Sequence, residues 1–144
     1  MQRSLEPKLS DRRALTERSC PKPLAISSHD LALLAANFAL DKKAADVVIL
    51  DLRELTSVTD FFVICSGSAH VHVKAIADHI KESLTQEDQK PWHIEGLPYG
   101  SWVLMDCIDV VVHVLLKERR EFYGLERLWG DAPIERVKEE YQRD

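Results

Sequence analysis

The chain has 144 residues, of which 45% are hydrophobic and 30% are charged, and this size and balance fit one folded domain with a single core. No apolar run approaches the roughly 20 residues that a helix needs to cross a bilayer, so we expect no membrane contact. No apolar signal segment opens the chain, so we expect a cytoplasmic protein.

The net charge of −5 is unevenly distributed along the chain. Residues 1–27 carry six basic and three acidic side chains, which leaves 13 basic against 21 acidic residues in the rest. An acidic surface repels phosphate backbones, so we expect no direct binding to DNA and an attraction to a basic protein partner.

Residues 1–27 also differ from the rest in composition, because they contain three prolines and few apolar side chains. We therefore predict a disordered N-terminal extension at 1–27 and a folded domain at 28–144. An organellar presequence is the alternative for the extension, although its acidic residues count against that reading.

Cysteines and histidines give no metal-binding pattern. Cys20, Cys65 and Cys107 are odd in number and widely spaced, which suits a reducing compartment and argues against disulfides and zinc. His70 and His72 are two residues apart on a predicted helix, so they face different directions. We expect no metal site and no cofactor.

The first half of the folded part predicts two helices and two strands. A cluster of capping residues at 27–30 precedes apolar residues at helical spacing. The apolar runs 46–52 and 60–65 predict buried strands that pair as a hairpin. A second helix with an apolar stripe follows at 73–84, and we expect Ser68 to be its N-cap.

The second half predicts a short strand at 92–95 and a hairpin formed by 102–106 and 110–116, which flank a short polar turn. Apolar residues at 122, 125, 128 and 129 have helical spacing and predict one helix packed on the sheet. A further helix is expected to begin at Pro133. These elements predict an α/β (α+β) fold with a mixed sheet of about five strands and flanking helices.

The Gly67-Ser68 turn lies between a strand and a helix, an arrangement that presents backbone N–H groups to an anion. Nucleotidyltransferases combine such a turn with carboxylates that alternate on one strand and hold magnesium. Here Asp106 and Asp109 are three residues apart across a turn. We therefore expect a structural turn and no enzyme, with a nucleotide-binding or nucleotidyltransferase-like enzyme as the alternative.

Aromatic residues indicate a functional surface more strongly than the Gly67-Ser68 turn does. Trp102 opens a strand, and Tyr123 and Trp129 belong to the following helical segment beside Arg120 and Arg127. Aromatic and arginine side chains are enriched in protein interfaces, so we predict a protein-binding surface here. Packing within the core is the alternative for these aromatic residues.

Six segments in a fixed order resemble one known family: 59–68 (TDFFVICSGS), 73–78 (VKAIAD), 95–96 (EG), 102–106 (WVLMD), 109–114 (DVVVHV) and 118–132 (ERREFYGLERLWGDA). Over residues 29–133 the chain resembles the ribosomal silencing factor family, RsfS, also called the Iojap family. It departs from that family at Cys107-Ile108, where an aromatic residue or Leu followed by Gly is usual. Because Ile disfavours a left-handed conformation, we expect a hairpin turn of different shape.

The resemblance implies a repressor of translation that acts when nutrients are short. Members bind the fourteenth protein of the large ribosomal subunit on the face that meets the small subunit, and so block joining of the subunits. The resemblance also implies a nucleotidyltransferase-like fold without an active site, and a homodimer when free. Matched residue by residue, it implies a partner-binding set made up of Trp102, Asp109, His113, Arg120, Tyr123 and Trp129.

Overall fold

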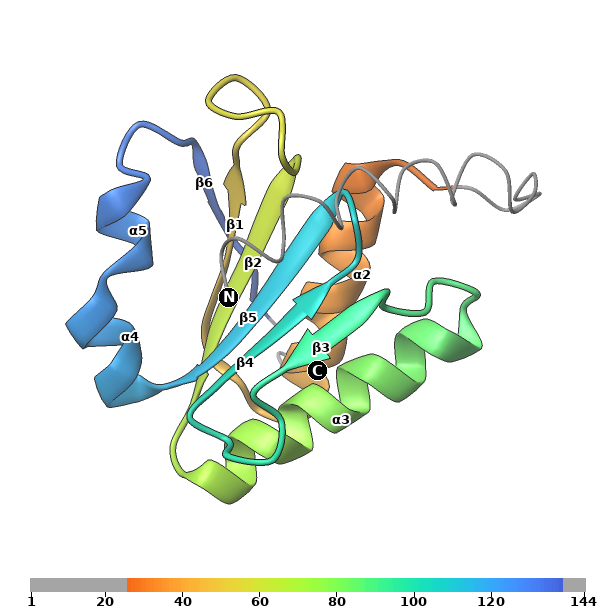
Figure 1. The fold of residues 1–144 in the computed structure, drawn as a ribbon, viewed down its shortest axis with the longest axis vertical. Coiled ribbons are helices and arrows are strands. Elements are labelled where there is room, and N and C mark those ends of the chain that lie inside the picture. The colour runs from red at the N-terminus through yellow and green to blue at the C-terminus, as the bar shows by residue number, and fades with distance from the viewer. Residues whose placement is uncertain (1–25, 139–144) are drawn as a thin grey trace.

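The computed structural model describes residues 26–138 (Figure 1). Its elements in chain order are α2 (Ser28–Asp41), β1 (Ala45–Asp51), β2 (Phe61–Gly67), α3 (His70–Gln86), β3 (His93–Glu95), β4 (Trp102–Asp106), β5 (Val110–Leu116), α4 (Lys117–Tyr123), α5 (Leu125–Leu128) and β6 (Ile134–Arg136). Most of the predicted extension, residues 1–25, lies outside the described residues, so its disorder stays a prediction. The hydroxyl of Ser27 accepts a hydrogen bond from the Asp30 amide at 3.0 Å and caps α2 as predicted.

The strands form one sheet in the order β3-β4-β5-β2-β1-β6. Strands β2 and β5 are parallel, and every other neighbouring pair is antiparallel. The five predicted strands are all present with ends within two residues of the prediction, and both predicted hairpins form. The mixed α/β architecture is therefore confirmed, with one strand more than expected.

The additional strand is β6, and it replaces the helix predicted to start at Pro133, so that prediction was wrong. Ile134 pairs with Leu50 and Arg136 with Val48 along β1. The Val137 amide also donates to the Val47 carbonyl at 2.9 Å. Pairing with β6 satisfies backbone groups that β1 would otherwise present at an open edge of the sheet.

Alternation of side chains gives the sheet two different faces. Helices α2 and α3 cover one face, where Val63, Val112 and their neighbours form the larger core (Figure 1). Segments α4 and α5 lie on the other face, above a smaller core that includes Leu50, Ile64 and Leu115. We call this second face the α4–α5 face.

The single helix predicted after β5 is divided in two, so that prediction was also wrong. Gly124 adopts the left-handed conformation, with φ 57° and ψ 52°, and it ends α4 and begins α5. This break changes the helical phase, because a left-handed residue interrupts the 3.6-residue repeat. Phe122 and Leu128 are consequently 76% and 73% exposed, whereas Arg120 and Leu125 are buried.

The turn between β4 and β5 contains a strained residue. Ile108 has φ 74°, the left-handed region that β-branched side chains disfavour. The Asp109 amide donates to the Cys107 carbonyl at 2.9 Å, so Ile108 is the centre of a three-residue turn. The Asp106 carboxylate accepts the Ile108 amide at 2.9 Å and stabilises this conformation. Ile108 therefore occupies the left-handed position despite its side chain.

Candidate functional site

Six aromatic rings form a continuous row across the α4–α5 face, and we call this set the aromatic row: Phe122, Tyr123, Trp102, His113, Phe62 and Trp129. The distances between successive ring centroids are 5.1, 4.8, 6.0, 4.5 and 5.9 Å in that order. Several of these pairs meet edge to face or tilted, the arrangement that aromatic quadrupoles favour.

The sheet positions the central members of the row. Strand alternation places Trp102 on the α4–α5 face, while the next residue, Val103, is buried against the helices on the other face. His113 belongs to β5 and lies opposite Leu104 of β4 and beside Ile64 of β2. Three neighbouring strands therefore contribute one ring each, and the rings at the ends come from α4 and from Trp129, which directly follows α5.

His113 fixes the orientation of Trp102. The indole Nε1–H of Trp102 donates to His113 Nδ1 at 3.1 Å, so the imidazole proton belongs on Nε2. His113 is only 4% exposed, and burial lowers its pKa to about 3. Its Nε2 has no hydrogen-bond partner among the described residues, and its ring packs against Phe62. His113 is therefore neutral at pH 7, and it is the buried member of the row that holds Trp102 in place.

Solvent exposure differs along the row. Phe122 and Tyr123 are exposed, Trp102 and Trp129 are partly buried, and His113 is buried. The exposed side chain of Leu128 enlarges the apolar surface at α5. Among the side chains of this surface, the most exposed apolar groups thus lie on α4 and α5, where a partner can contact them without unfolding the domain.

Arg120, another predicted partner-binding residue, is buried beneath α4. Its guanidinium donates to the Ser66 hydroxyl at 2.8 Å and to the Glu126 carboxylate at 2.6 and 3.2 Å. Burial raises the pKa of Glu126 and the hydrogen bonds from Arg120 lower it, with a net lowering. Arg120 therefore joins α4, α5 and β2 and positions the row without belonging to it.

Asp109 lies at one end of the α4–α5 face, in the strained turn. Its carbonyl accepts the amides of Asp60 and Phe61 at 2.9 and 3.2 Å, which ties the turn to β2. Phe62 pairs with Val111, two residues from Asp109, whereas Trp102 pairs with Leu115 at the other end of β5. The structure thus brings Trp102, His113, Tyr123 and Trp129 into one row. Asp109 lies outside the row, near the end of β5 that pairs with Phe62, and Arg120 also lies outside it, bonded to Ser66 and Glu126.

Sequence reasoning missed three members of this surface. The apolar run 60–65 predicts a buried position for Phe62, and the helical spacing after β5 predicts a buried stripe that contains Phe122 and Leu128. Phe61 is 2% exposed, so alternation alone places Phe62 on the opposite face of the sheet. Strand alternation could have predicted that Phe62 lies on the α4–α5 face. The helix-breaking residue Gly124 could have predicted that Phe122 and Leu128 do not share one buried stripe.

The Gly67-Ser68 turn is shaped by packing. Contrary to the prediction, Ser68 does not cap α3; its amide donates to His72 Nδ1 at 2.9 Å, and His72 Nε2 lies 2.8 Å from the Lys42 carbonyl. A Cβ atom at Gly67 would lie 2.8 Å from the Val73 side chain, so only glycine fits. The amide that an anion would need is already bonded to His72.

The carboxylates of the described residues also form no metal-binding group with this turn. Asp51 is held by Arg53 at 2.7 Å, and this hydrogen bond lowers the pKa of Asp51. Among residues 26–138, no three His, Cys, Asp or Glu side chains lie close enough together to hold a metal ion. No helix in the same range is long and apolar enough to cross a membrane.

Fold and surface together define a mixed α/β domain with an aromatic face of the composition common in protein–protein interfaces. A family model described as "Ribosomal silencing factor during starvation" matches residues 25–144. The chain therefore belongs to the RsfS family, as its sequence motifs predicted.

Individual relatives agree with this membership. The chain is 43% identical to ribosomal silencing factor RsfS of Halalkalibacterium halodurans over 75% of this chain and 92% of that protein. It is 35% identical to the chloroplastic protein Iojap of Zea mays over 72% of this chain but only 46% of that protein. A crystal structure of a Chromobacterium violaceum protein superposes with a TM-score of 0.72 and 31% identity, over 81% of this chain and 98% of that one.

Proposed function

We propose that this protein silences ribosomes by binding the large subunit through its fourteenth protein and thereby blocking the small subunit. The single observation that carries the proposal is the aromatic row, an accessible apolar surface on a chain of the RsfS family. Family membership supplies the ribosome as the target. The row supplies groups of the kind that anchor protein interfaces.

The proposed action is steric and needs no catalysis. A bound domain of this size fills space that the small subunit requires, so the lifetime of the complex determines the degree of repression. Outside residues 1–27 the chain has 21 acidic and 13 basic residues, which favours association with a basic ribosomal protein at low salt. Buried aromatic contacts would then slow dissociation.

Sedimentation of ribosomes tests this proposal. Purified protein is added to separated subunits, which are then mixed and analysed on a sucrose gradient. We expect the protein to migrate with free large subunits and the peak of assembled ribosomes to fall. Unchanged assembly in the presence of excess protein would contradict the proposal.

We further propose a homodimer for the free protein. Phe122 and Leu128 present apolar side chains that are 76% and 73% exposed, and a second copy would remove part of this surface from water. Light scattering after gel filtration should give twice the chain mass of 16.4 kDa. A monomer mass at all concentrations tested would remove the dimer from the proposal.

We propose a cytoplasmic factor of the bacterial type. The chain is 43% identical to the ribosomal silencing factor of Halalkalibacterium halodurans and 35% identical to the chloroplastic Iojap protein of Zea mays. Mass determination of the native N-terminus tests this, because an organellar presequence would be removed from the mature protein.

A further inference from the structure

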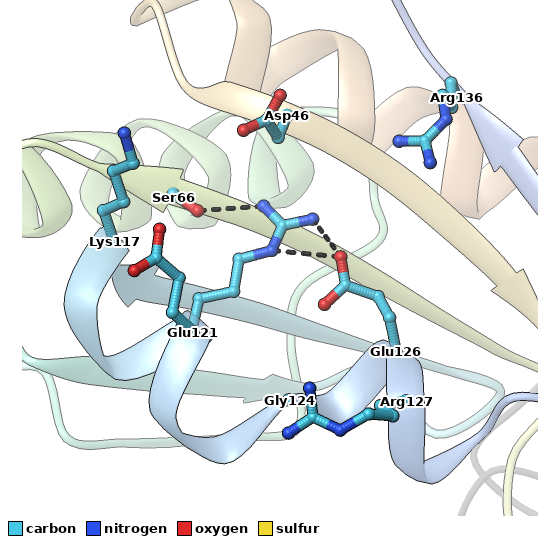
Figure 2. Close-up of a pocket in the computed structure, with 9 residues that line it drawn as sticks. Asp46, Ser66, Lys117, Glu121, Gly124, Glu126, Arg127 and Arg136 are labelled. Atoms are coloured by element: carbon cyan, nitrogen blue, oxygen red, sulfur yellow. Dashed lines mark hydrogen bonds and ion pairs between the residues drawn. The ribbon is translucent and has the colours of Figure 1, made fainter.

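A pocket of about 430 Å³ lies between the ends of the sheet strands and segments α4 and α5, and none of its lining residues belongs to the aromatic row. Its volume falls within the range of small-molecule sites, about 300–1,000 Å³. Its lining residues come from several elements (Figure 2): Asp46 of β1, Lys117 and Glu121 of α4, Glu126 and Arg127 of α5, and Arg136 of β6.

The position of this pocket in the sheet favours ligand binding. Strands β2 and β5 are parallel neighbours, and the chain leaves β2 toward α3 on one face and leaves β5 toward α4 on the other (Figure 1). Open α/β sheets bind ligands at the carboxyl ends of such diverging strands. Ser66, near the end of β2, and Lys117, directly after β5, both line the pocket.

A bulge shapes one wall of the pocket. Ala45 pairs with Ser66 and Val48 with Ile64, so two residues of β1 lie opposite one residue of β2. Asp46, one of these two, has φ 50° and lines the pocket. Bulges commonly redirect side chains at functional sites, and here the bulge turns a carboxylate toward the cavity.

The charges of the lining define the chemistry of a ligand. Arg120 and Glu126 neutralise each other through their ion pair. The side chains of Lys117, Arg127 and Arg136 form no close ion pair with another side chain in the described part of the chain, although the charge of Arg136 helps to lower the pKa of Glu126. These three cations can bind a phosphate group. The carboxylates of Asp46 and Glu121 can accept hydrogen bonds from hydroxyl groups.

The residues that line the pocket also limit which chemical groups the ligand can have besides phosphate and hydroxyl groups. Besides Gly124, every residue that lines the pocket is charged or is Ser66, and none is aromatic. A nucleobase would therefore find no ring to stack on and little apolar surface to cover it. We propose that this pocket binds a small phosphorylated polyol, such as a sugar phosphate, which its phosphate and hydroxyl groups anchor. This inference does not depend on ribosome binding.

Calorimetric titration of the full chain with ribose 5-phosphate tests the proposal. We expect saturable binding with one site per chain, at least tenfold tighter than binding of inorganic phosphate or of ribose. Adenosine 5′-phosphate should bind no tighter than ribose 5-phosphate, because the base makes no favourable contact. Absence of saturable binding, or a nucleotide that binds much more tightly than the sugar phosphate, would overturn the proposal.

Variants locate the binding. Arg127→Gln and Arg136→Gln should each weaken binding of ribose 5-phosphate about tenfold, as expected for loss of a charge-assisted phosphate contact. Arg119→Gln is the matched control, because Arg119 is exposed on α4 and does not line the pocket. Thermal unfolding verifies that each variant is folded. An equal loss in all three variants would show non-specific attraction and refute the site.

Discussion

The buried imidazole of His113 predicts a specific dependence of stability on pH. Its pKa is about 3 in the folded protein because burial disfavours the charged form, whereas an unfolded histidine titrates near 6.5. The unfolded chain therefore binds one more proton than the folded chain between these two values. The contribution of His113 to stability is complete above about pH 6.5 and decreases as the pH falls toward 3.

The magnitude follows from the size of this window. Each pH unit below about 6.5 lowers the free energy of unfolding by about 1.4 kcal/mol, so His113 accounts for about 2 kcal/mol between pH 7.5 and pH 5.0. His113→Asn removes the titrating group and keeps an oxygen that can accept the indole N–H of Trp102. The other ionisable groups contribute equally to both proteins, so the difference between them isolates His113.

Urea unfolding at pH 7.5 and pH 5.0 measures this difference. Whatever the stability of the variant at either pH, its loss of stability between the two pH values should be about 2 kcal/mol smaller than that of the wild-type protein. Parallel losses in the two proteins would refute the reasoning, because His113 would then titrate alike in the folded and unfolded states.

Three further changes test the surface and its support. In a pull-down titration, Trp102→Ala should weaken binding to large ribosomal subunits by about 2 kcal/mol, or roughly 30-fold. Tyr99→Ala is the control, because it changes an exposed residue outside the aromatic row, and it should leave binding unchanged. Arg120→Met should lower the free energy of unfolding by about 2–3 kcal/mol, since Glu126 and Ser66 lose their hydrogen-bond partner. Adding Glu126→Gln to this variant should restore part of the lost stability. If the effects of the two substitutions were fully additive, the proposed interaction between Arg120 and Glu126 would be contradicted. Ile108→Gly should stabilise the protein by about 1 kcal/mol in urea unfolding by relieving the left-handed conformation, an effect that Ile108→Ala should not reproduce.

Local patterns in the sequence predicted most of the sheet. The strands of both hairpins are apolar runs bounded by polar turns, and their alternation is sufficient to place Trp102 and His113 on one face. Family motifs then identified the functional class without any geometry. These features depend on short stretches of chain, so a single sequence contains them.

The remaining features depend on contacts between distant residues. β6 exists because β1 offers it an edge, and nothing within 134–136 distinguishes this strand from a helix start. Arg120 is buried because Ser66 and Glu126 provide acceptors from two other elements. Charged residues are ordinarily found at the surface, and the family motif that implies a partner-binding role for Arg120 contains no signal of its burial.

The hydrogen bond between Trp102 and His113 also affects how a partner would be captured. A free indole on a surface samples several rotamers, and immobilising a flexible side chain on binding costs about 0.5–1.5 kcal/mol. In this protein the ring is already held in one orientation by the imidazole beneath it and by Tyr123 beside it. Docking at this surface would therefore require little additional ordering of the Trp102 side chain, so a larger part of the free energy of each contact would contribute to the binding affinity.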